Sequence, residues 1–137
     1  MIIRDHDGRF LSGRANWYGS AYDAMMMEAM ACRDGIQWAR EAGVSKLCLE
    51  TDCLELVNLW KMLRSQRSRV SLILQDIKSI STSFDEFAFV YANRTCNRAA
   101  HVCAREVSCE FRRVEWHQNP PNSLRNLLEN DCNHVLV

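Results

Sequence analysis

Two acidic residues end a short run whose pattern is typical of a buried strand. Residues 46–52 read Lys-Leu-Cys-Leu-Glu-Thr-Asp, so that leucine alternates with other side chains before Glu50 and Asp52. A carboxylate at the carboxyl end of a buried strand is held at the edge of the sheet, where open α/β sheets bind ligands. Catalysis by Asp52 is one interpretation of this run. The alternative is a helix cap, because a helical pattern begins at Cys53 and the Asp52 carboxylate would accept its first backbone N–H groups.

A third acid lies on the long helix predicted before this strand. Within residues 21–41, apolar side chains from Met25 to Ala39 recur at alternating intervals of four and three, which is typical of one helix face. Glu28 lies on the same side as this stripe, so its carboxylate is expected to face the sheet that carries Asp52. The alternative is a residue at the boundary of the buried face, with its stem on apolar surface and its carboxylate in solvent.

The remaining pattern predicts a mixed α/β fold. A hairpin with an Asp-Gly turn opens the chain, and a strand at residues 84–92 has apolar side chains on both faces, so it is expected to be covered on both sides. The predicted order is strand, strand, helix, strand, helix, helix, strand, helix. We expect one domain over residues 1–110, followed by a C-terminal loop and one short docked helix over residues 111–137.

The composition limits the classes of protein to consider. Apolar residues make up 47% of the chain, and 17 Lys and Arg balance 17 Asp and Glu, so a nucleic-acid site would have to come from local clustering. No run approaches the length of a membrane span, and residues 4–7 are polar where a secretory signal would need an apolar core. This favours an intracellular protein, nuclear or cytoplasmic, with no membrane partner. Seven cysteines without a Cys-x-x-Cys pair, several of them on apolar faces, favour free buried thiols over zinc or disulfides.

Four cations and no acid fall within nine residues between two predicted helices. They are Lys61, Arg64, Arg67 and Arg69. One interpretation is contact with phosphate groups, and the other is a solvated corner between helices. His101 lies in the last helix of the predicted order, beside buried positions, where a lone histidine is usually structural.

Four short motifs together resemble the ribonuclease H-like domain. In order, they are Ile3-Arg4-Asp5-x-x-Gly8, Met27-Glu28-Ala29-Met30-Ala31, Leu49-Glu50-Thr51-Asp52 and Arg94-x-x-Asn97-Arg98-Ala99-Ala100-His101-x-x-Ala104. Their order and spacing cover the chain to about residue 108. They are most similar to the plant retroelement-derived, reverse-transcriptase-like branch of the ribonuclease H type-1 domains.

The resemblance implies a mixed sheet flanked by helices and hydrolysis of the RNA strand of RNA–DNA hybrids. In that family, carboxylates hold two Mg²⁺ ions about 3.5–4 Å apart, one activating water and the other stabilising the leaving oxygen. The resemblance places catalytic, metal-binding acids at Glu28 and Asp52 and a degenerate metal position at His101. The expected partner is an RNA–DNA hybrid or a duplex like double-stranded RNA. The residues expected to contact it are Lys61, Arg64, Arg67, Arg69, Arg94, Asn97 and Arg98.

The sequence departs from the family in three places. The family's first acid lies in a central opening strand that has no counterpart here, so unpaired strand edges are expected, and Asp5 and Asp7 fall in the hairpin turn instead. His101 replaces the last acid, and no mobile histidine occurs between Val90 and Asn97. Because two carboxylates supply about half the negative charge that two divalent ions require, we expect weak or no hydrolysis. The alternative is a non-catalytic nucleic-acid-binding or interaction module that kept the scaffold.

Overall fold

The computed structural model describes residues 1–19, 22–63 and 68–130. The order of elements confirms the sequence prediction as far as α4. Along the chain, these elements are β1 (Ile2–Arg4), β2 (Phe10–Asn16), α1 (Ala24–Glu41), β3 (Lys46–Thr51), α2 (Leu54–Lys61), α3 (Arg69–Ser81), β4 (Glu86–Tyr91), α4 (Arg98–Ala104), β5 (Arg113–His117) and α5 (Asn122–Asn130). Within this part of the chain, no helix combines the length and the apolar character needed to cross a lipid bilayer.

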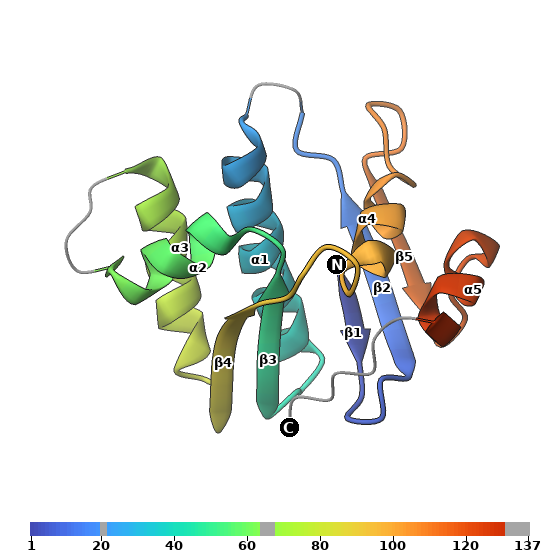
Figure 1. Cartoon of the computed structure of the whole chain (residues 1–137), viewed down its shortest axis with the longest axis horizontal. Helices are drawn as coiled ribbons and strands as arrows, with labels where there is room; N and C mark the ends of the chain where they lie inside the picture. Colours follow the sequence, from blue (N-terminus) through green and yellow to red (C-terminus); the bar gives the residue numbers. More distant parts are fainter. Residues whose placement is uncertain (20–21, 64–67, 131–137) are drawn as a thin grey trace. The chain divides into compact units, whose positions relative to one another are not determined.

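The elements form two compact units, each with its own sheet (Figure 1). The first unit comprises Met1–Ser20 and Asn93–Val137, and its strands pair in the order β1-β2-β5. The second unit is Ala21–Ala92, and its strands β3 and β4 pair in parallel. The mixed α/β class is therefore confirmed. β1 and β3 are each the terminal strand of a sheet, where unpaired edges were expected.

The hairpin of the first unit forms because Asp5 closes its turn. The Asp5 carboxylate accepts hydrogen bonds from the backbone N–H groups of Asp7 and Arg9, both at 2.9 Å, and Gly8 takes a φ of +77° that favours glycine. These bonds lower the pKa of Asp5, with the Arg9 N–H as the largest cause. As predicted, β1 and β2 pair in antiparallel fashion on either side of this turn.

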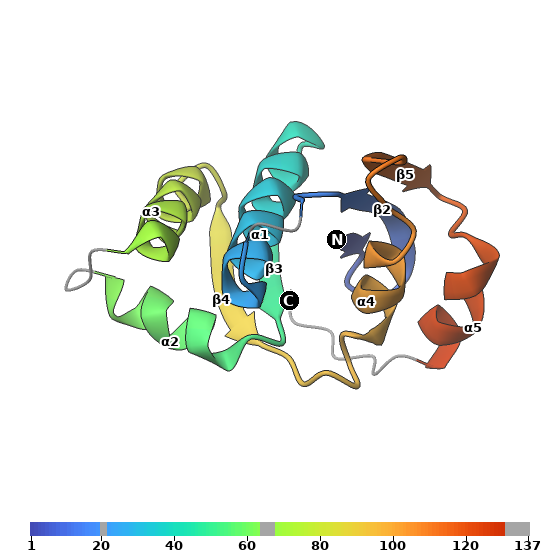
Figure 2. The same cartoon turned by 90° about the horizontal axis from the view of Figure 1, so that it is seen from above.

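The segment after α4 contains a strand that the sequence prediction missed. Residues 113–117, expected to belong to a loop, form β5 and pair antiparallel with β2. Trp116 packs on the same core as α4 and α5, in which the side chains of Ala15, Ala99, Cys103 and Leu124 are buried. Figure 2 shows α4 beside β2 in this unit. The short helix predicted around Leu124 is present as α5.

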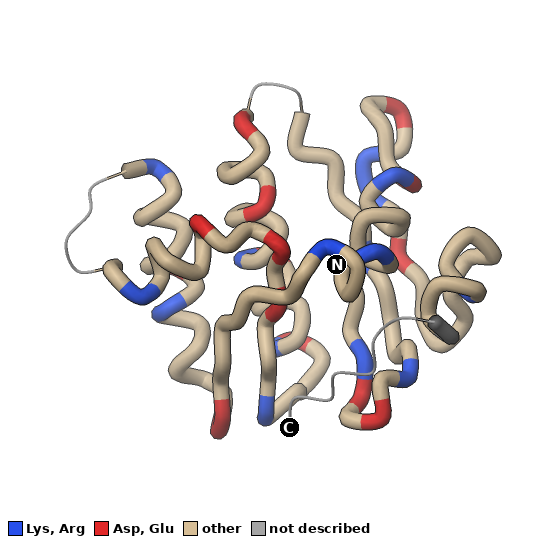
Figure 3. The backbone as a smooth tube through the Cα atoms, in the orientation of Figure 1, with Lys and Arg blue, Asp and Glu red and all other residues tan. Residues whose placement is uncertain are grey.

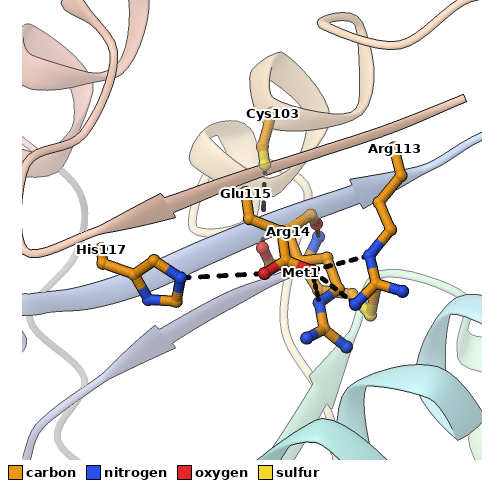
Figure 4. Close-up of polar contacts among 6 residues, drawn as sticks. All are labelled: Met1, Arg14, Cys103, Arg113, Glu115 and His117. Carbon is orange, nitrogen blue, oxygen red and sulfur yellow. Dashed lines mark hydrogen bonds and ion pairs between the residues drawn. The ribbon is translucent and has the colours of Figure 1, made fainter. Parts of the chain in front are cut away.

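A charged cluster covers the other side of the β2–β5 pair (Figure 4). Arg14 and Glu115 are register partners, and Arg14 Nε lies 3.0 Å from Glu115 Oε1. Arg113 Nε donates to the same oxygen at 2.6 Å, and His117 Nε2 lies 3.7 Å from Glu115 Oε2. The Arg113 hydrogen bond, together with the charge of Arg14, lowers the pKa of Glu115. The same view shows the Met1 amino group donating to the Arg14 carbonyl at 2.8 Å.

The second unit is a two-stranded parallel sheet packed with helices. α1 begins at Asp23, whose carboxylate accepts a hydrogen bond from the backbone N–H of Met26 at 2.7 Å. α1 packs against α3 and β3, and α2 packs against β4. The buried side chains of α1 confirm most of the predicted apolar stripe, although Met26 is buried instead of Met25.

The expectation that the strand at residues 84–92 is covered on both faces is wrong for β4. Phe87 and Phe89 lie edge-on to Trp60 of α2, with ring centroids 5.9 and 5.4 Å away. Ala88, on the opposite face, is exposed, and so is Tyr91 at the strand end. The small apolar side chains on the Ala88 face led to the prediction that this face is buried, but no helix of the second unit covers Ala88.

Candidate functional site

The second unit brings Glu28 to the carboxyl end of β3. Glu28 Oε1 accepts a hydrogen bond from the hydroxyl of Thr51, the last residue of β3, at 2.6 Å. Thr51 is fully buried, and its hydroxyl also accepts the backbone N–H of Cys53 at 3.1 Å. The half-buried Asp52 is the next residue of the chain. The structure thus places the helix acid against the residue that directly precedes the strand-end acid.

The end of β3 also bears on the alternative interpretation of Asp52 as a helix cap. α2 begins at Leu54, and Cys53 occupies the N-cap position without a side-chain capping bond. Asp52 therefore lies one position before the N-cap of α2. Asp52 is half-buried at the end of the strand, a location from which a carboxylate can meet a ligand.

Burial and charge around this site hold a neighbouring cysteine neutral. Cys32 lies one helical turn after Glu28 on α1 and is buried. Burial raises the pKa of the Cys32 thiol strongly, and the negative charge of Glu28 raises it further, although a hydrogen bond with Thr51 acts in the opposite direction. Cys32 is therefore an inert thiol in the core beside the site.

The residues that the resemblance assigned to Mg²⁺ do not fit a two-ion site. Within residues 1–19, 22–63 and 68–130, no three His, Cys, Asp or Glu side chains are grouped so as to hold a metal ion. One oxygen of Glu28 is already bonded to Thr51. Two Mg²⁺ ions require several oxygen ligands each, and a neutral imidazole is a poor substitute for such a ligand.

His101 instead lies in a cavity lined by arginines, which we call the α4 pocket. This cavity of about 240 Å³ belongs to the first unit, and its lining residues are Arg94, Arg98, His101, Val102 and Arg105. Figure 3 shows basic residues on α4 and on the turn that leads into it. Asn97, predicted to contact nucleic acid, is half-buried just before α4 and does not line the pocket. The α4 pocket is therefore characterised by positive charge and not by a set of metal ligands.

The basic cluster between α2 and α3 is described only at its two ends. Lys61 is the last residue of α2 and Arg69 the first residue of α3, and both are exposed. Arg64 and Arg67 lie outside the described residues. α3 begins with a reciprocal capping arrangement, in which Ser68 and Ser71 each accept a backbone N–H of the other.

Sequence reasoning missed two members of these sites. Thr51 carries no signal in its type or spacing that it bonds Glu28. Arg105 was detectable, because it lies seven residues after Arg98 and therefore on the same helix face. Among the cysteines that the structure describes, free thiols occur at Cys32, Cys48, Cys53, Cys103 and Cys109, of which Cys32 and Cys103 are buried and Cys109 is exposed.

A mixed α/β fold in which an acid of a long helix bonds the last residue of a strand is consistent with a ribonuclease H-like domain, a nucleic-acid-related class. Residues 1–107 match the reverse transcriptase-like family, and because this is more than half of the 137 residues, the chain belongs to that family. No curated protein and no solved structure matches the chain. The resemblance stated from four motifs is thus confirmed at the level of the ribonuclease H-like family.

Proposed function

We propose that this chain is a nucleic-acid-binding ribonuclease H-like domain whose hydrolysis of RNA in RNA–DNA hybrids is weak or lost. The observation that carries the proposal is the end of β3, where Glu28 accepts a hydrogen bond from Thr51, the residue that directly precedes Asp52. They belong to a family match that covers residues 1–107. Among the described residues, no third ligand completes a group able to hold a metal ion.

Nucleic-acid binding would use local positive charge, since the chain as a whole is neutral. The described basic residues available for this are Lys61 and Arg69 beside the α2–α3 connection and Arg94 and Arg98 around α4. Lys and Arg bind the phosphate backbone without reading sequence, and an A-form-like hybrid is recognised largely through its shape, phosphates and 2′-hydroxyls. Sequence-independent duplex binding is therefore the expected mode.

The proposal is tested with purified protein and a labelled RNA–DNA hybrid in Mg²⁺ or Mn²⁺. We expect no turnover, or a residual rate far below the roughly 1 s⁻¹ at the lower end of typical enzymes. Asp52→Asn and Glu28→Gln serve as the site variants, and Glu55→Gln, an exposed acid on α2, is the matched control. Cleavage at an ordinary enzymatic rate that Asp52→Asn abolishes would contradict the proposal.

Binding is measured separately, by fluorescence anisotropy of the same hybrid at several salt concentrations. The logarithm of the binding constant should fall with the logarithm of salt concentration, with a slope of about −0.9 for each phosphate contacted. Lys61→Glu and Arg69→Glu should weaken binding, whereas Arg40→Glu, an exposed charge in the last turn of α1, should not. Absence of hybrid binding at low salt would overturn the proposal.

A non-catalytic binding or interaction module is the second candidate. The observation that favours it is the α4 pocket, where arginines surround the residue at the family's last acid position. Salt-dependent binding without any cleavage that depends on Asp52 selects this candidate. Residual cleavage that depends on Asp52 selects the weakened enzyme.

A further inference from the structure

The α4 pocket has the form of an anion site on one face of a helix. Arg98, His101, Val102 and Arg105 are spaced by three, four and seven residues, so they lie on one side of α4 and its C-terminal cap. Arg94 adds a third guanidinium from the turn one helical turn earlier in the chain. The three arginines are exposed, and His101 and Val102 are half-buried.

The lining of the pocket is positively charged. Three guanidinium groups and no carboxylate line it. Arg98 and Arg105 form no ion pair with another residue of the described chain. Glu106, the nearest acid along the sequence, accepts a hydrogen bond from the Ser123 hydroxyl of α5 at 2.9 Å. Like charges held together repel one another, and a bound anion relieves this repulsion.

The opposite face of α4 fixes the position of the pocket. Ala99 and Cys103 are fully buried in the core formed with Ala15 of β2 and Leu124 of α5. The Cys103 thiol also donates to the Met1 carbonyl, with an Sγ–O distance of 3.7 Å. Because these contacts hold the helix backbone, the pocket residues project from a packed element and not from a loop alone.

We propose that the α4 pocket binds one phosphate group of a nucleic-acid strand, in place of a metal ion. Guanidinium groups have no lone pair with which to ligate a metal, but their planar N–H forks bind phosphate oxygens in pairs. The cavity, at about 240 Å³, is smaller than the roughly 300 Å³ at the lower end of small-molecule sites, so it suits one phosphate better than a whole nucleotide.

The first test uses inorganic phosphate and the whole 137-residue chain. At constant ionic strength, with chloride in the reference sample, phosphate should cause saturable NMR shifts at the backbone amides of residues 94–105. Arg98→Glu and Arg105→Glu should each weaken this binding at least tenfold, and Arg98→Lys, which keeps the charge but loses the fork, should weaken it less. Arg40→Glu, on α1, is the matched control and should leave the shifts unchanged.

A titration with Mg²⁺, compared with the phosphate titration, decides which ligand the pocket binds. Mg²⁺ alone should not shift the His101 signals, and saturable Mg²⁺ shifts there without phosphate shifts would overturn the proposal. Phosphate shifts that are absent, or spread equally over the whole surface, would overturn it as well. Both titrations use unmutated protein, so they remain decisive even if a variant fails to fold.

The nucleic-acid source of the phosphate rests on the proposed function and has its own measurement. With the RNA–DNA hybrid, Arg98→Ala should weaken binding and make the salt slope shallower by about one unit, as expected for one lost phosphate contact. An unchanged slope with intact binding of inorganic phosphate would reject the nucleic-acid source and assign the pocket to free phosphate. If the unmutated protein does not bind the hybrid, the proposed function fails, while the inorganic phosphate titration still judges the pocket itself.

Discussion

Glu28 of α1 and Thr51 of β3 are joined by a hydrogen bond of 2.6 Å from the Thr51 hydroxyl to the Glu28 carboxylate. Thr51 is fully buried, and its hydroxyl also accepts the N–H of Cys53 at the start of α2. One side chain therefore connects three successive elements of the second unit at the point where the family acids lie. The stability of this connection and the position of Glu28 depend on the same hydroxyl.

Thr51→Val should destabilise the protein by about 1–3 kcal/mol. Valine preserves the shape of threonine but removes the hydroxyl, so the Glu28 carboxylate loses one hydrogen bond and the Cys53 N–H loses its acceptor. Urea unfolding followed by circular dichroism measures the change in free energy. Thr51→Ser, which keeps the hydroxyl, should lose less.

Thr82→Val is the matched control for this substitution. Thr82 is exposed at the end of α3, where its hydroxyl donates to the Ser79 carbonyl at 2.7 Å, and its replacement should cost less than about 0.5 kcal/mol. Equal losses for Thr51→Val and Thr82→Val would mean that the buried hydrogen bond contributes nothing to the stability of the unit.

Alkaline pH should destabilise the protein through Cys32. Burial raises the pKa of this thiol above its value in the unfolded chain, so the folded state holds the proton more tightly. Stability should be unaffected below about pH 8.5, the ordinary thiol pKa, and fall by about 1.4 kcal/mol per pH unit above it. Urea unfolding at pH 7.5 and 9.5 measures this decline, and Cys32→Ala should remove only part of it, because burial also raises the pKa of the Cys48 and Cys103 thiols.

Cys109→Ala controls for cysteines in general, because Cys109 is exposed. The comparison uses the difference between the two pH values for each protein, so any stability lost at neutral pH through the smaller Cys32→Ala side chain cancels. A decline that persists undiminished in Cys32→Ala would assign the alkaline sensitivity to other groups.

Local patterns in the sequence identified most elements of the fold. The period of the stripe around Ala29 and Ile36 fixed the long helix, and the Asp-Gly turn at Asp7 and Gly8 fixed the hairpin. Strand β5 was not predicted, although Val114 and Trp116 alternate with charged residues. Its partner β2 lies about 100 residues earlier in the chain, and a neighbouring double proline suggested a loop. Pairing between distant segments is decided by tertiary structure and not by local pattern.

The candidate sites were predictable to a smaller extent. The direction of Glu28 followed from helix periodicity, but its bond to Thr51 depends on how α1 packs over β3, which spacing along the chain does not specify. At His101, family resemblance suggested a degraded metal position, whereas the local charges come from Arg98 and Arg105 on the same helix face. Because Arg98 lies three residues before His101 and Arg105 four residues after it, the positive charge around His101 can be predicted from the sequence.

Acid should destabilise the first unit through Glu115. The Arg113 hydrogen bond lowers the pKa of this carboxylate in the folded state. Its contribution is therefore present above the unfolded pKa of about 4.3 and is lost as the pH falls through the lower folded value. Thermal melting between pH 3 and 6, a range set by the ordinary glutamate pKa of about 4.3, should show a smaller acid-induced loss for Glu115→Gln than for the unmutated protein.

Glu110→Gln is the control for this acid sensitivity, since Glu110 is exposed. At neutral pH, Glu115→Gln should cost no more than about 1 kcal/mol, the usual range for partly exposed ion pairs. An acid profile of Glu115→Gln that coincides with the unmutated profile would show that the cluster in Figure 4 does not stabilise the β2–β5 pair.

Leu124→Ala should destabilise the first unit by about 2–5 kcal/mol. Leu124 of α5 is fully buried in a core with Ala15, Ala99 and Cys103, so truncation leaves a cavity between α5 and elements that belong to the family match. Leu72→Ala, at a 61% exposed position of α3, should cost less than about 0.5 kcal/mol. Hydrogen exchange should show lost protection in β2 and β5 and retained protection in β3 and β4. The reason is that Leu124 belongs to the core that packs against the first sheet. Equal costs for the two substitutions would mean that the segment beyond residue 107 does not stabilise the hairpin on which it packs.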